Sequence, residues 1–153
     1  MPKQKVTTFL WFDDKAEEAT NFYVSLFKDS RIDKVARGPT GSAIIVQFTL
    51  SGIHYLALNG GPRFPFTEAI SLSVICDDQA EIDELWEKLS AGGSKSRCGW
   101  LKDRYGLSWQ IVPSVLNTLM SDPDSTKVKR VFETMMPMEK LDIASLQRAY
   151  HDQ

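Results

Sequence analysis

Few side chains in this sequence could hold a metal ion or work as a nucleophile with a neighbouring base. The chain of 153 residues has two histidines, His54 and His151, and two cysteines, Cys76 and Cys98, that lie far apart. An open catalytic metal site needs about three protein ligands, and nucleophilic catalysis needs a base beside the nucleophile. We therefore expect both histidines to be ordinary surface residues, and we predict neither a metal site nor a cofactor.

Aromatic and amide side chains are better candidates for a site, because small-molecule pockets combine apolar walls with a few polar groups. We predict a ligand-binding set of three tryptophans and two amides: Trp11, Asn59, Trp100, Trp109 and Gln110. The alternative for each aromatic is that it fills the core. Along a strand, Gln110 alternates with Trp109 and Ile111, so those two neighbours would face the opposite way.

The elements that must position these residues occur twice in the same order. A predicted strand over residues 6–12 precedes a helical stripe over 16–26 and strands over 31–36, 43–50 and 53–58. The order then begins again. A strand over 69–76 precedes a helical stripe over 82–89 and strands near 95–98, 100–102 and 107–112.

A short sequence repeat supports this duplication. Residues 12–17, FDDKAE, and residues 76–81, CDDQAE, are identical at four of six positions and 64 residues apart. In both copies the Asp-Asp pair is a predicted helix N-cap. Internal repeats of this kind predict repeated supersecondary units. We predict an α+β fold with two βαβββ modules, about 5–62 and 67–113, in a single domain over 1–153.

Residues 114–153 form a predicted helical tail. Val128, Val131, Phe132 and Met135 make a helical stripe, Pro137 ends it, and a short helix capped by Asp142 follows. An amphipathic tail must dock on its own sheet or on a partner subunit. We therefore expect a homodimer.

The bulk composition excludes some partners. Lysine plus arginine is 18 and aspartate plus glutamate is 20, giving a net charge of −2. A nucleic-acid surface usually carries a basic excess, and no stretch resembles a signal-peptide core or a membrane span. We expect a cytoplasmic protein whose partner is a small-molecule ligand, with neither nucleic acid nor membrane.

Several segments together resemble one family. They are Phe9-Leu10-Trp11-Phe12, Asn21-Phe22-Tyr23, residues 56–62 (LALNGGP), residues 98–103 (CGWLKD) and residues 106–113 (GLSWQIVP). The chain resembles the PhnB-like proteins of the glyoxalase/bleomycin resistance/dioxygenase (vicinal oxygen chelate) superfamily. The resemblance covers nearly the whole chain, tail included, although the loop near 38–41 looks shorter than usual.

This resemblance implies two modules with cup-shaped sheets, and subunits that pair. It also implies where metal-dependent relatives place four ligands, on the first and last strands of each module. Those positions fall here at Thr7, Ala57, Ile70 (or Ser71) and Gln110, of which only Gln110 could coordinate a metal. Members often carry the label 3-demethylubiquinone-9 3-methyltransferase, which is a name rather than an activity.

Three functions stay open at this point. The first is a metal-free protein that binds a small molecule without transforming it. The second is an enzyme of unusual type, using Gln110, Asn59 and Lys102 or Asp103. The third is a metal-dependent lyase, isomerase or dioxygenase, or the methyltransferase of the family label. For methyl transfer, Asn59-Gly60-Gly61-Pro62 follows a strand, but residues 63–66 (RFPF) cannot open a regular helix.

Overall fold

The structure, a computed structural model, describes residues 4–152 and divides into two compact units. The first ends at Phe66 and the second begins at Thr67. Among the described residues, no helix combines the length and the apolar character that crossing a membrane requires.

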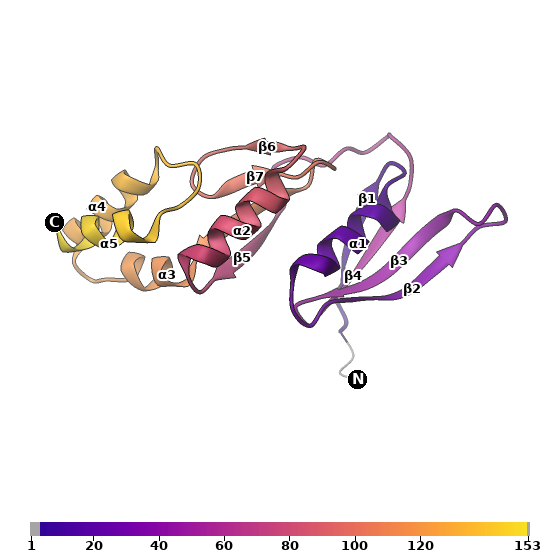
Figure 1. The fold of residues 1–153 in the computed structure, drawn as a ribbon, viewed down its shortest axis with the longest axis horizontal. Coiled ribbons are helices and arrows are strands. Elements are labelled where there is room, and N and C mark those ends of the chain that lie inside the picture. The colour runs from indigo at the N-terminus through magenta and orange to yellow at the C-terminus, as the bar shows by residue number, and fades with distance from the viewer. Residues whose placement is uncertain (1–3, 153) are drawn as a thin grey trace. The chain divides into compact units, whose positions relative to one another are not determined.

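The first unit is a four-stranded sheet with one helix on it (Figure 1). Its elements are β1 (Thr8–Phe12), α1 (Ala16–Leu26), β2 (Arg31–Arg37), β3 (Ala43–Leu50) and β4 (Ile53–Asn59). The strand order is β1-β4-β3-β2, and only the β1–β4 pair is parallel. A helical crossover is what two parallel neighbours require, and α1 supplies it.

The second unit repeats this order. Its elements are β5 (Ser71–Cys76), α2 (Gln79–Ser90), β6 (Ser94–Lys95), β7 (Trp100–Lys102) and β8 (Ser108–Pro113). The strand order is β5-β8-β7-β6, with β5 and β8 parallel. The predicted α+β fold of two βαβββ modules is therefore confirmed.

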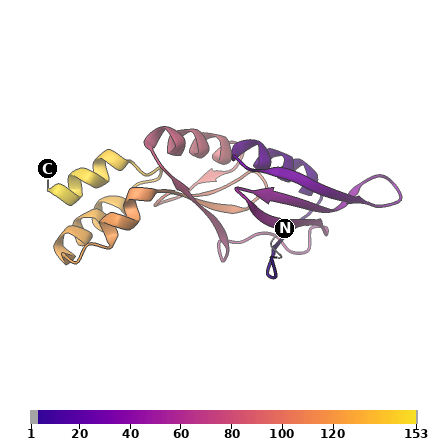
Figure 2. The same cartoon turned by 90° about the horizontal axis from the view of Figure 1, so that it is seen from below.

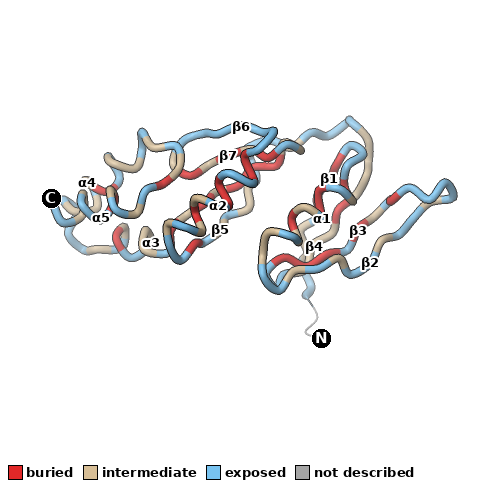
Figure 3. Tube along the Cα trace, in the orientation of Figure 1, coloured by how far each residue is buried: buried red, intermediate tan, exposed pale blue. Residues whose placement is uncertain are grey.

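Each sheet buries the face that its helix covers, and Figure 3 marks the buried residues in red on the helices and strands of both units. In the first unit, Leu10, Phe12 and Ala57 are buried, and the Phe12 ring packs 6.5 Å from that of Tyr23 in α1. In the second unit, the fully buried side chains include Trp86 of α2 and Trp109 of β8. The strands alternate, so the residues between these buried positions form a second, open face on each sheet.

The two helices begin differently, despite the repeated Asp-Asp sequence. The N-cap of α2 is Asp78, whose carboxylate accepts the Glu81 N–H at 2.9 Å, as predicted. The predicted cap at Asp13 and Asp14 is wrong. The N-cap of α1 is Lys15, which makes no side-chain capping bond.

The tail forms three helices in the second unit: α3 (Ser114–Met120), α4 (Ser125–Met135) and α5 (Ile143–His151). The last two helices and the cap of α5 at Asp142 agree with prediction, and the N-cap of α4 is Asp124, whereas α3 was not predicted. Leu119, Val131 and Leu146 form a small core between the helices, and α4 and α5 lie side by side (Figure 2).

The tail docks on the second unit's own elements. The Gln79 side chain of α2 donates to the Leu141 carbonyl at 3.0 Å and accepts the Ile143 N–H at 2.9 Å. The backbone N–H of Gly99 donates to the Glu139 carbonyl at 2.8 Å. The sequence left two possibilities for the tail, its own sheet or a partner subunit. In the structure the tail packs on the chain's own second unit.

Candidate ligand-binding site

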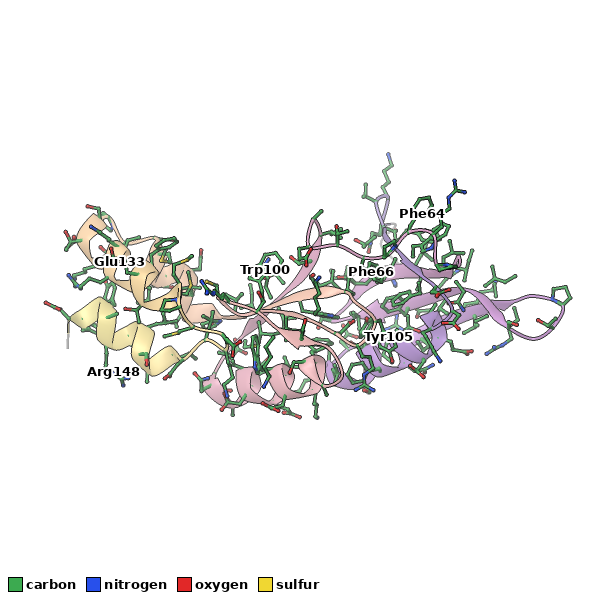
Figure 4. The ribbon with its side chains drawn as sticks, turned by 90° about the horizontal axis from the view of Figure 1, so that it is seen from above. Phe64, Phe66, Trp100, Tyr105, Glu133 and Arg148 are labelled. Carbon is green, nitrogen blue, oxygen red and sulfur yellow. The ribbon has the colours of Figure 1, made fainter. Side chains whose placement is uncertain are left out.

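The open face of the second sheet carries polar side chains on β7 and β8. Trp100 lies opposite Gln110, and Lys102 lies opposite Ser108, in antiparallel register. Their neighbours in sequence turn to the other face, where Leu101 is buried beneath α2 with the other core residues. Figure 4 shows Trp100 on the side of the sheet away from α2.

A pocket of about 200 Å³ opens on β6 and β7. Its wall contains three serines, two lysines, one glutamate, one leucine and one tryptophan: Ser94, Ser96, Ser108, Lys95, Lys102, Glu68, Leu101 and Trp100. All of them belong to the second unit. Six of these eight side chains are polar or charged, so the wall is more polar than that of most small-molecule sites, and Trp100 is its one large aromatic.

Ser108 is the residue in this wall that the fold itself does not explain. It is 0% exposed, and its Oγ has no hydrogen-bond partner among the residues that the structure describes. A buried hydroxyl left unsatisfied costs about 1–3 kcal/mol. A ligand atom in the pocket could supply the missing partner.

The charged groups of the pocket are held by exposed ion pairs. Lys102 Nζ contacts Glu68 Oε1, and Lys95 Nζ lies 3.7 Å from Glu87 Oε1 of α2. The hydrogen bond from Lys102 holds the pKa of Glu68 below its ordinary value. Glu68 is therefore a carboxylate at neutral pH, and it lies in the turn just before β5.

Two of the five predicted site residues lie together on this open face. Trp100 lines the pocket, and Gln110 is its cross-strand neighbour. The Gln110 side chain donates from Nε2 to Ser71 Oγ at 3.0 Å. Trp109 faces the other way, as its alternation with Gln110 implies. It is 1% exposed.

Asp103 explains the position of Trp109. Its Oδ2 accepts the indole N–H of Trp109 at 2.9 Å. Its Oδ1 accepts the backbone N–H groups of Tyr105 at 2.9 Å and Leu107 at 3.1 Å. This 2%-exposed carboxylate therefore fixes both the β7–β8 turn and the core tryptophan. Asp103 and Trp109 act here as parts of the scaffold.

The other two predicted residues, Trp11 and Asn59, lie in the first unit. The Trp11 indole N–H donates to the Gly61 carbonyl at 2.9 Å, and its ring packs edge-on to Phe64 at 4.9 Å. A Cβ at Gly60 would lie 2.4 Å from the Trp11 ring. Gly60 and Gly61 thus serve the packing of Trp11, and residues 62–70, which follow them, form turns and coil. This loop does not supply the glycine turn opening a helix on which a nucleotide-type methyl donor would be bound.

Asn59 has both ends of its amide engaged by backbone. Its Oδ1 accepts the Ala16 N–H at 2.8 Å, and its Nδ2 donates to the Ala43 carbonyl at 3.0 Å. Asn59 therefore caps α1 from the end of β4, in place of the predicted Asp13 and Asp14. The sequence carries no local signal for this contact, because 43 residues separate its partners.

A polar cluster that sequence reasoning missed lies on β2, β3 and β4. Thr49 Oγ1 donates to Asp33 Oδ2 at 2.7 Å and lies 3.0 Å from His54 Nδ1. Arg31 Nε contacts Asp33 Oδ1 at 2.9 Å. His54 is half-buried within β4 and is not an isolated surface histidine. Its cross-strand register with Thr49 could have revealed the contact.

The strand positions that hold a metal in related folds carry poor donors here. The register expected for β4 is off by one, since Ala57 is buried among core residues facing α1 and Leu56 and Leu58 take the open face. On the second sheet, Ser71 rather than Ile70 is the strand residue beside Gln110. Among the described residues, no three His, Cys, Asp or Glu side chains are grouped so that they could hold a metal ion. The donors at these positions do not fit a divalent transition metal.

Solved structures of other proteins share this fold. The PhnB protein of Bacillus cereus matches with 39% identity and a TM-score of 0.69, over 72% of this chain and 100% of its own. PA1353 of Pseudomonas aeruginosa matches with 18% identity and a TM-score of 0.61, over 72% of this chain and 98% of its own. The fosfomycin resistance protein FosX of Mesorhizobium loti matches with 16% identity and a TM-score of 0.59, over 80% of this chain and 100% of its own.

These likenesses define the class: the fold is that of the vicinal oxygen chelate superfamily. More narrowly, residues 4–112 match the sequence model of the 3-demethylubiquinone-9 3-methyltransferase family. The chain belongs to this family, that of the PhnB-like proteins, as the sequence motifs predicted. The family match ends at residue 112, so the expected resemblance of the tail is not part of it. Among curated proteins, no sequence matches the chain.

Proposed function

We propose that this protein binds a small molecule in the pocket of its second unit, without a bound metal. The observation that carries the proposal is Ser108, a residue of the pocket wall whose enclosed hydroxyl lacks a partner among the described residues. Native proteins rarely leave such a group without a protein, water, ion or ligand partner. Trp100 and Lys102 supply an aromatic wall and a charged donor beside it.

The proposal assigns no chemical step to the pocket. Ser108 has no base beside it, since its hydroxyl lacks any partner among the residues described. A serine nucleophile needs a base within hydrogen-bond reach. The strand positions offer serine, leucine and one glutamine, whereas an open metal site needs about three good protein ligands. Binding is what these groups can do.

The first test compares Ser108→Ala with the parent protein in a small-molecule library screened by NMR on ¹⁵N-labelled full chain. We expect hits that move the Trp100 indole signal and the backbone signals of residues 94–96. Ser108→Ala should weaken those hits while leaving the fold intact, because the parent hydroxyl forms no bond that holds the fold together. Hits that leave the Trp100 signal unmoved and shift only other regions would contradict the proposal.

A second test addresses metal and turnover. We expect elemental analysis of the purified protein to find transition metals well below one per chain, and added Zn²⁺, Mn²⁺ or Ni²⁺ to leave the Gln110 side-chain signals in place. Each confirmed ligand should be recovered unchanged after prolonged incubation. Stoichiometric metal with a perturbed Gln110, or chemical conversion of the ligand, would favour an enzyme instead.

We further propose that the protein is a cytoplasmic homodimer. Phe132 and Met136 remain exposed on and just after α4 although the tail docks on its own unit, which leaves apolar surface for a second copy. Sedimentation at micromolar concentration should give the mass of two chains, and cell fractionation should recover the protein with soluble cytoplasmic markers. A purely monomeric species would contradict the dimer.

A further inference from the structure

We propose that the ligand of this pocket carries an acid group on a planar apolar body, and that Glu68 occupies the place of that acid group while the pocket is empty. This inference rests on the proposed function, and it names the class of ligand. The shared chemistry is an anionic oxygen group, whether carboxylate, phosphate or phosphonate.

The first step is the balance of donors and acceptors in the wall. Lys95 and Lys102 each present only donors, and the three serine hydroxyls can donate as well. Glu68 is the one acidic side chain in the wall. The charged side chains of the wall are two lysines and one glutamate, a balance of +2 − 1 = +1, and an anionic oxygen group neutralises this excess positive charge best.

The second step is the position of Glu68. It contacts Lys102 Nζ from a turn that precedes β5, whereas Lys102 belongs to β7. The side chains of both residues are well exposed, at 62% for Glu68 and 40% for Lys102. Exposed ion pairs contribute little to stability, so the Glu68 carboxylate can be exchanged for another anion at low cost. Lys102 then has a negatively charged partner both when the pocket is empty and when a ligand is bound.

The third step is the shape of the remaining wall. Trp100 is half-buried and lies two residues before Lys102 on the same face of β7. Its indole offers a flat apolar surface, against which planar groups pack well. An acid group at Lys102 and Ser108 would therefore place a planar body attached to it against Trp100. Lys95 is partly engaged by Glu87, at 3.7 Å, and can assist from β6.

The test uses three probes of similar size with the full chain: phenylphosphonate, benzoate and neutral benzamide. NMR titration follows the Trp100 indole signal, assigned with Trp100→Phe. We expect both acids to move it and benzamide to bind at least about tenfold more weakly, because charge-assisted hydrogen bonds are the stronger ones. Raising the salt concentration should weaken the acids alone.

Variants then separate the roles of the two charged residues. Lys102→Met should weaken phenylphosphonate at least about tenfold. Glu68→Gln should tighten it roughly threefold, because the competing carboxylate is gone. The matched controls are Lys88→Met and Glu84→Gln, which break the exposed Lys88–Glu84 pair of α2, 2.6 Å apart, outside the pocket. Neither control should change binding.

The outcomes distinguish this inference from the proposed function. Benzamide binding at Trp100 as tightly as the acids would overturn the acid group and leave the small-molecule pocket standing. Unchanged or weaker binding by Glu68→Gln would overturn the role of Glu68. If no library compound and none of the three probes moves the Trp100 signal, the inference and the proposed function both fail.

Discussion

The two βαβββ units share their element order but place their polar groups differently. In the first unit, the open-face hydroxyl of Thr49 is bonded to Asp33 and lies beside His54, and the amide of Asn59 is engaged by backbone. In the second unit, the buried Ser108 hydroxyl has no partner among the described residues, and Ser108 is a residue of the pocket wall. The polar groups of this architecture are thus satisfied internally in one copy, whereas the other copy keeps an unpaired hydroxyl among its described residues, where we propose that a ligand binds.

The strands of the two sheets account for part of this difference. In the first sheet β2 and β3 have seven and eight residues, whereas β6 and β7 have two and three. Long paired strands satisfy their backbone in the ladder and leave little irregular chain. Beside the short β6 and β7, irregular chain contributes Ser96, just after β6, and Glu68, in the turn before β5, to the wall of the pocket. Binding sites commonly lie on such irregular segments supported by a rigid sheet.

The largest expected effect separates the two helix caps. Asn59→Ala removes the cap of α1 and a hydrogen bond to β3, so we expect the first unit to lose about 2–4 kcal/mol of stability. Asp78→Ala should cost the second unit only about 1 kcal/mol. Hydrogen exchange of the amides in α1 and α2 measures each unit separately.

Asn59→Asp is the control for this comparison. It keeps an acceptor for the Ala16 N–H and removes the donor to the Ala43 carbonyl. The stability of the first unit in Asn59→Asp should therefore lie between that of the parent and that of Asn59→Ala. Equal losses from Asn59→Ala and Asp78→Ala would show that the distant cap does not hold the first unit together more strongly than a local one.

The next effect compares the buried hydroxyls. Thr49→Val keeps the volume but leaves Asp33 and His54 without their shared partner, at an expected cost of about 1–3 kcal/mol. Ser108→Ala removes a hydroxyl that has no partner in the structure described, so stability should be unchanged or higher. Urea unfolding followed by probes in each unit tests the contrast. A clear loss of stability in Ser108→Ala would mean that the hydroxyl already serves the fold.

The third effect compares the tryptophans of the two open faces. Trp100→Leu should weaken phenylphosphonate by about 1 kcal/mol, or roughly fivefold, through loss of the aromatic wall. Trp11→Leu should leave that binding unchanged, because the Trp11 indole serves Gly61 and Phe64 in the first unit. The reverse result would move the site to the first unit.

Much of this arrangement could be predicted from local sequence. Strand β3, over Ala43–Leu50, and the cap at Asp78 follow from alternation and capping chemistry. Along β8, Gln110 and Trp109 point to opposite faces of the sheet. The same alternation places Ser108 on the face of Gln110, so Ser108 could have been predicted as a site residue. The role of Asn59 could not. Asn59 acts over 43 residues, and a side-chain amide that caps a distant helix leaves no periodic pattern.

The smallest effect is the response to acid, which should be larger in the second unit. The Asp83 pKa is lowered by hydrogen bonds from Gln79 and Lys140, and the Asp122 pKa by a hydrogen bond from Tyr150. A lowered folded-state pKa gives stability that is present above the ordinary carboxyl range, near 4, and lost as the pH falls through the folded value. Both aspartates help to hold the tail, at α2 and at α5.

The first unit has one comparable exposed pair, in which Arg37 lowers the pKa of Glu17. Glu17 joins α1 to β2, which belongs to a sheet of long strands. Protonation of Glu17 should therefore expose few backbone amides of the first unit to exchange. Amide exchange in residues 125–151 should therefore rise before that in α1 as the pH falls from 7 towards 3. Asp83→Asn together with Asp122→Asn should remove most of this pH dependence while leaving that of α1. Simultaneous opening of both regions would show that the tail is held by its apolar core rather than by these carboxylates.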